Sequence, residues 1–89
     1  MFEWDKSKEQ INVAKHGLSF TEVRDFAWHE AVVLDRSRPE DGEKRYAAIG
    51  ILDGELHTII FTRPGKKRTR IISFRRANTS EEKAYEENT

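Results

Sequence analysis

The stretch RPGKKRTRIISFRR, residues 63–76, is the part of the chain around which the rest is organised. It holds seven of the sixteen lysine and arginine residues and no carboxylate, although the whole chain has a formal net charge of zero. Ile71, Ile72 and Phe74 interrupt the basic residues, and apolar side chains of this size need burial. The stretch therefore predicts a structured strand that holds its arginines in place, rather than a solvated basic tail.

Length and composition limit the fold and the kinds of site. A chain of 89 residues is long enough for one small domain, so residues 1–89 are expected to form a single domain. The absence of cysteine excludes disulfides, thiolate metal sites and thiol catalysis. The acidic N-terminus and the lack of a long apolar run predict a cytoplasmic protein. Apolar residues make up 36% of the chain, which predicts a thin core built on large side chains: Trp4, Phe20, Phe26, Trp28, Phe61 and Phe74.

Charge is distributed unevenly along the chain. Residues 1–62 carry 8 basic and 12 acidic groups, and residues 77–89 carry 1 and 4. A strongly positive surface on an otherwise acidic molecule suits the binding of a polyanion such as a nucleic acid. It fits an acidic partner protein equally well.

The N-terminal third predicts a strand followed by two helices. Phe2–Trp4 alternates aromatic and charged residues, as a short strand does. The first helix is expected to begin after Asp5, an N-cap residue, and to end at Gly17. Ile11, Ala14 and Leu18 are at helical spacing. Ser19 and Glu22 form a capping-box pattern that opens a second, short helix reaching about Ala27.

The remainder predicts four strands and a last helix. The strands are expected at Ala31–Leu34, Lys44–Leu52, Glu55–Thr62 and Arg68–Phe74, with turns at Asp53-Gly54 and Pro64-Gly65. The sequence Thr79-Ser80-Glu81-Glu82 predicts a second capping box and an acidic C-terminal helix. The order β-α-α-β-β-β-β-α indicates an α+β fold with a small antiparallel or mixed sheet, two N-terminal helices and one C-terminal helix.

Taken together, the motifs resemble those of the BrnT toxins over almost the whole chain. They are FEWD at 2–5, NVAKHGLSFTE at 12–22, AIG at 48–50, RIIS at 70–73 with Arg75, Arg76 and Ala77, and then Glu82 and Tyr85. The resemblance implies a RelE-like fold and a bacterial, metal-independent endoribonuclease, without a cofactor, that arrests growth. It also implies a BrnA-like antitoxin, a ribbon-helix-helix protein that binds DNA, covers the toxin in a hetero-oligomer and represses the shared operon with it.

The chain departs from the family pattern at two places. The loop from Asp35 to Pro39 lacks the histidine that many members carry there, so that role is absent or passes to an arginine. Phe74 follows Ile-Ile-Ser where a small residue is common, and we expect it to reshape the substrate side of the strand.

Cleavage of RNA without a metal needs a base, an acid and cations that stabilise the extra charge at phosphorus. Arginine meets the last need because its guanidinium group binds two phosphate oxygens. Strand alternation sends Arg68, Arg70 and Arg76 to one face and Arg75 to the other. The predicted catalytic residues are Lys15, His16, Arg63, Arg70 and Arg76, and the predicted phosphate-binding residues are Lys67, Arg68 and Arg75.

Several of these residues have a second interpretation. The arginines can instead pair with carboxylates of the last helix, and Tyr85 is either an acid or a packing residue. His16 is the best acid–base candidate because histidine titrates near neutral pH, but its position also suits a helix-dipole partner. His57 is expected on the surface of a strand and His29 in a turn. A non-catalytic module that binds a nucleic acid or an acidic protein remains the alternative function.

Overall fold

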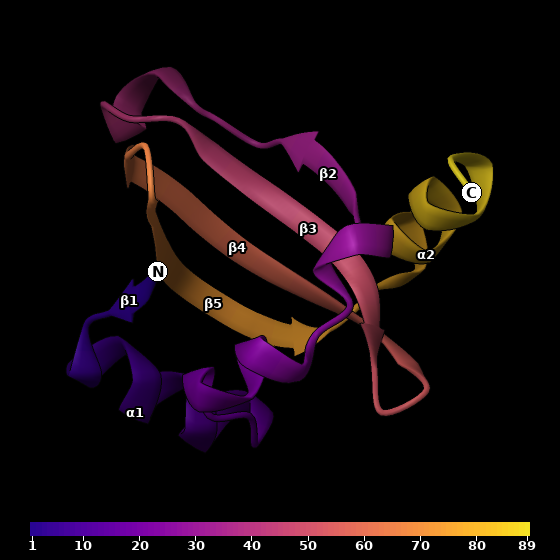
Figure 1. Cartoon of the computed structure of the whole chain (residues 1–89), viewed down its shortest axis with the longest axis horizontal. Coiled ribbons are helices and arrows are strands. Elements are labelled where there is room, and N and C mark those ends of the chain that lie inside the picture. Colours follow the sequence, from indigo (N-terminus) through magenta and orange to yellow (C-terminus); the bar gives the residue numbers. More distant parts are fainter.

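The computed structural model describes residues 1–89 as a five-stranded sheet with helices on both of its faces (Figure 1). The strands lie in the order β1-β5-β4-β3-β2; β1 runs parallel to β5, and all other neighbours are antiparallel. This mixed α+β sheet confirms the predicted fold class. The elements are β1 (Phe2–Trp4), α1 (Lys6–His16), the 3₁₀ helices η1 (Phe20–Asp25) and η2 (Trp28–Glu30), β2 (Val32–Asp35), the 3₁₀ helix η3 (Pro39–Asp41), β3 (Arg45–Leu52), β4 (Glu55–Gly65), β5 (Arg68–Arg76) and α2 (Thr79–Glu87).

The two hairpins of the sheet differ in how well their turns were predicted. Asp53 and Gly54 both have positive φ, 52° and 80°, as a tight two-residue hairpin turn requires. The prediction of a turn at Pro64-Gly65 is wrong: both residues lie in β4, and the turn is at Lys66-Lys67. The strand tolerates the proline because the register shifts between Thr62 and Gly65, where the regular ladder is interrupted.

The helices form where predicted, with two corrections. The second N-terminal helix is not α-helical but a pair of short 3₁₀ helices, although Ser19 and Glu22 do form the predicted capping box. The C-terminal capping box is one residue earlier than predicted, with Asn78 as the cap and Glu81 as its partner. No helix is long and apolar enough to cross a membrane.

The core lies between the sheet and the segment that contains α1, η1 and η2; we call this side of the sheet the helix face. Of the six predicted core aromatics, four are buried in one cluster, and Trp4 and Trp28 pack against it partly buried. Aromatic contacts connect these layers, because Trp4 meets Phe20 edge-on and Trp28 meets Phe61 edge-on. The predicted thin aromatic core is confirmed.

The buried residue of α1 is not apolar. Ile11 is 65% exposed, whereas Asn12 is only 5% exposed. The Asn12 amide donates to the carbonyls of Leu18 (2.9 Å) and Phe74 (2.8 Å), and its Oδ1 accepts from the Phe74 amide (3.0 Å). Since β1 pairs with β5 only at residues 69–71, Asn12 supplies the hydrogen bonds that a longer β1 would have given to Phe74.

We predict that Asn12→Ala lowers the free energy of unfolding by about 2–3 kcal/mol, because it leaves the buried Phe74 backbone groups without partners. Urea denaturation checks this value. Gln10→Ala, at an exposed position of the same helix, is the matched control and is expected to change stability by less than about 0.5 kcal/mol. Equal stability of the two variants would show that Asn12 does not hold the helix to the sheet.

Candidate active site

A bulge in β5 decides which arginines share a face of the sheet. Ile60 pairs with Ser73, but its neighbour Phe61 pairs with Ile71, so Ile72 is an extra residue in the ladder. The alternation of side chains therefore reverses its phase at Ile72. The predicted distribution of arginines is wrong at this point: Arg70 and Arg75 share the face opposite the helix face, which we call the polar face, and Arg76 lies on the helix face.

Four side chains form a row across the polar face. Glu3 pairs in register with Arg70, Arg70 with Thr62, and Thr62 with Arg45, which links four strands. Glu3 accepts hydrogen bonds from Arg68 (2.7 Å) and Arg70 (3.0 Å), and these bonds lower its pKa to about 2. Adjacent strands are about 4.8 Å apart, so the backbones of Arg45 and Arg70 stand about 10 Å apart on either side of Thr62.

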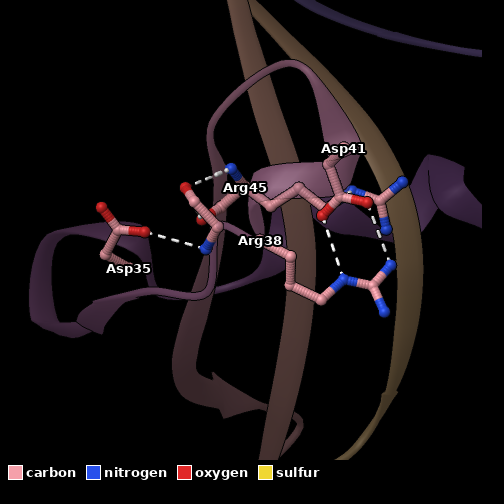
Figure 2. A network of polar contacts seen from close by, with 5 residues as sticks. Asp35, Arg38, Asp41 and Arg45 are labelled. Atoms are coloured by element: carbon pink, nitrogen blue, oxygen red, sulfur yellow. Dashed lines mark hydrogen bonds and ion pairs between the residues drawn. The ribbon is translucent and has the colours of Figure 1, made fainter.

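The centre of this row contains two buried polar atoms that make no hydrogen bond. Thr62 is 1% exposed, and its Oγ1 makes no hydrogen bond; the buried Arg45 Nε makes none either. Figure 2 shows that Asp41 stands between Arg38 and Arg45. Arg38 binds Asp41 through two hydrogen bonds, whereas Arg45 Nε lies 3.7 Å from the same carboxylate. Buried polar groups are normally satisfied, so the Thr62 hydroxyl is an exception, whereas Arg45 Nε lacks a hydrogen bond but is within ion-pair distance of Asp41.

Arg75 occupies the other end of the polar face, next to α2. It donates two hydrogen bonds to Glu81, at 2.7 and 2.9 Å, and Thr58 donates a third to the same carboxylate. Burial raises the pKa of Glu81, but the bonds from Arg75, the Asn78 amide and Thr58 outweigh it and lower the pKa to about 2. The interpretation that an arginine pairs with the last helix is confirmed for Arg75.

His16 and Lys15 end α1 near Arg75. Both side chains are exposed, and the helix ends at Gly17 with φ 71°. Partial loss of hydration lowers the pKa of His16 below 6.5, and the positive charges of Lys15 and Arg75 lower it further. The lowered pKa favours the neutral imidazole, which is the form that accepts a proton.

Of the other predicted site residues, Arg76, Arg63 and Lys67 lie away from these two groups, whereas Arg68 and Tyr85 lie beside them. Arg76 pairs with Glu55 on the helix face. Arg63 and Lys67 lie near the β4–β5 turn. Arg68, like Arg70, forms an ion pair with Glu3. Tyr85 is half-buried on α2, one turn from Glu81.

Three further expectations concern residues near the core. Phe74 does not face the substrate side. It is fully buried and makes an edge-to-face contact with the His57 ring. His57 is 5% exposed and is not the surface residue that was predicted. His29 lies in the single turn of η2 and is exposed.

Sequence reasoning missed Arg45 and Thr62. Arg45 stands beside a charged loop and Thr62 carries no charge, so neither drew attention. Only the register of β3, β4 and β5 brings them beside Arg70. No group of three or more histidine or carboxylate side chains is arranged to hold a metal ion.

Comparisons with known proteins agree with this architecture. The family model of BrnT, the ribonuclease toxin of type II toxin–antitoxin systems, matches residues 4–81. The crystal structure of the ribonuclease toxin BrnT of Brucella abortus is similar, with 31% sequence identity and a TM-score of 0.70 over 89% of this chain and 99% of that one. No curated protein matches the sequence. The chain therefore belongs to the BrnT family of ribonuclease toxins of type II toxin–antitoxin systems.

Proposed function

We propose that this toxin cuts RNA internally, without a metal ion, by attack of a ribose 2′-hydroxyl on the adjacent phosphorus. The observation that carries the proposal is the row on the polar face, where Arg45 and Arg70 flank the unpaired hydroxyl of Thr62. Two guanidinium groups and a donor hydroxyl are the groups that bind a phosphate. Their backbones sit on rigid strands, so the site is formed before RNA binds.

His16 is the proposed proton-transfer group. Its neutral imidazole takes the proton from the 2′-hydroxyl, the 2′-oxygen bonds to phosphorus, and the bond from phosphorus to the 5′-oxygen breaks. The 5′-oxygen receives a proton, for which Tyr85 on α2 is the candidate donor. The products are a 2′,3′-cyclic phosphate and a 5′-hydroxyl, and Lys15 and Arg75 stabilise the negative charge that builds up at phosphorus.

The two groups of residues fit successive phosphates of one strand. Arg70 and Arg75 pair with Thr62 and Thr58, which are four residues apart on β4, so the two arginines lie about 13 Å apart along the sheet. Glu3 holds the guanidinium group of Arg70 and Glu81 holds that of Arg75, so the two groups stay apart. The row around Thr62 therefore holds a different phosphate from the one that is cleaved beside His16. Arg63 and Arg76 lie on the helix face and take no part in this chemical step.

The phosphate site is tested by Arg70→Ala and Thr62→Val, with cleavage of RNA followed in EDTA. Each variant should raise KM by about 10-fold, because one contact to phosphate is lost. Thr62→Val should be at least as stable as the wild type, since it removes an unpaired buried hydroxyl. Arg24→Ala, an exposed arginine of η1 without an ion pair, is the control and should cleave normally. Cleavage that requires Mg²⁺, or intact RNA with the wild type, would disprove the mechanism.

The pH dependence of kcat/KM tests His16. A base must be unprotonated, so activity should fall as the pH decreases through the pKa of His16, with a midpoint below 6.5. His16→Gln should lose this limb of the profile and about 100-fold or more of the rate. The matched variant His29→Gln should keep both. A midpoint that is the same in His16→Gln and the wild type would assign the limb to another group.

A type II toxin has an antitoxin partner, and we propose that this one is a BrnA-like ribbon-helix-helix protein. The support is family membership together with a dipolar charge distribution that suits a charged partner. The complex would cover the toxin and repress the shared operon. Growth arrest on induced expression, rescued by the neighbouring reading frame, is the expected result; rescue without formation of a complex would count against direct covering.

A further inference from the structure

A groove on the helix face, near the β4–β5 turn, takes no part in the chemistry proposed above. Its volume of about 380 Å³ is within the range of small-molecule sites, about 300–1,000 Å³. The lining residues include four aromatic side chains and one cation: Phe2, Trp28, Tyr46, Phe61 and Arg63. They come from β1, η2, β3 and β4, so the groove exists only in the folded chain.

The rings in the groove are held in fixed orientations. Phe2 stacks on Trp28 with centroids 5.4 Å apart, and Tyr46 stacks on Phe61 at 5.5 Å. The Trp28 indole donates to the Val23 carbonyl at 2.8 Å, which fixes its ring. Phe2, Trp28 and Tyr46 are only partly buried. Flat aromatic surfaces of this kind are the platforms on which unpaired nucleobases stack.

The uncompensated positive charge of the basic stretch lies near the β4–β5 turn, and one of its residues, Arg63, lines the groove. Arg68, Arg70, Arg75 and Arg76 each pair with a carboxylate. In contrast, the exposed side chains at the β4–β5 turn, Arg63, Lys66 and Lys67, form no ion pair. Arg63 donates to the Lys66 carbonyl and also lines the groove. Aromatic platforms bordered by free cations match a nucleotide, which has a flat base and an anionic phosphate.

We propose that this groove binds a nucleobase of the RNA substrate, with the neighbouring phosphates on Arg63, Lys66 and Lys67. The inference rests on the proposed RNA cleavage, to which it adds a second contact. Because the groove and the row around Thr62 lie on opposite faces at the same end of the sheet, a single strand passes from one to the other around the β4–β5 turn. A protein anchor would use the aromatic groove but would not need Arg63 in its lining or two further free cations at the adjacent turn.

Tryptophan fluorescence tests the proposal. In a Trp4→Phe background, Trp28 is the sole tryptophan, and a short 2′-O-methyl RNA, which lacks the attacking hydroxyl, serves as an uncleavable probe. Binding should quench Trp28. Arg63→Ala and Tyr46→Leu should weaken binding about 10-fold and raise KM for cleavage by a similar factor, with kcat nearly unchanged. Lys83→Ala, an exposed lysine of α2 that forms no ion pair, is the control for loss of charge.

The outcomes separate the two proposals. Absence of quenching, or wild-type affinity in both groove variants while the wild type cleaves RNA, would overturn the groove alone. A wild type that quenches and binds but does not cleave would overturn the proposed reaction and leave the groove supported. Groove variants that bind RNA normally but lose a co-expressed protein partner would show that the groove is a protein docking site and would overturn the proposal.

Discussion

The hydrogen bonds between Asn12 and Phe74 are the interaction on which the arrangement of this small protein depends. β1 is too short to cover all of β5, so the edge of β5 would otherwise present unpaired backbone groups beyond Ile71. One side chain on α1 satisfies both groups at Phe74 and also binds the loop after the helix. The same contact fixes the end of α1 and therefore places Lys15 and His16 beside the strand that carries Arg75.

The bulge at Ile72 is the second constraint, because it assigns the arginines to faces. Without the extra residue, Arg70 and Arg76 would share a face and Arg75 would stand alone. With it, Arg70 and Arg75 both face away from the helices and define the two ends of one polar surface. Ile71 and Phe74 both turn to the core, where each is fully buried. The bulge thus allows one strand to bury Ile71 and Phe74 on one face and to place Arg70 and Arg75 on the other.

The basic stretch has two parts, which differ in whether their positive charges are paired with carboxylates. Its strand arginines are held by carboxylates from β1, β4 and α2, so their positions are fixed and much of their charge is neutralised. The residues at the turn are free, and they stand next to an aromatic groove. Rigid arginines suit the positioning of a phosphate, whereas free cations suit the first attraction of a polyanion.

The sequence by itself determined most elements, the α+β class, the aromatic core and the family. These features depend on local signals that extend over only a few residues, such as the Asp5 cap, the Asp53-Gly54 turn and the KHGLSF motif. Only the tertiary structure decided the site. The partner of Arg75 is six residues away, but that of Arg70 is Glu3 at the other end of the chain, and Thr62 and Arg45 join the row through strand register alone. Register and bulges depend on how the whole sheet packs, so a local pattern such as alternation in residues 68–76 could not reveal them.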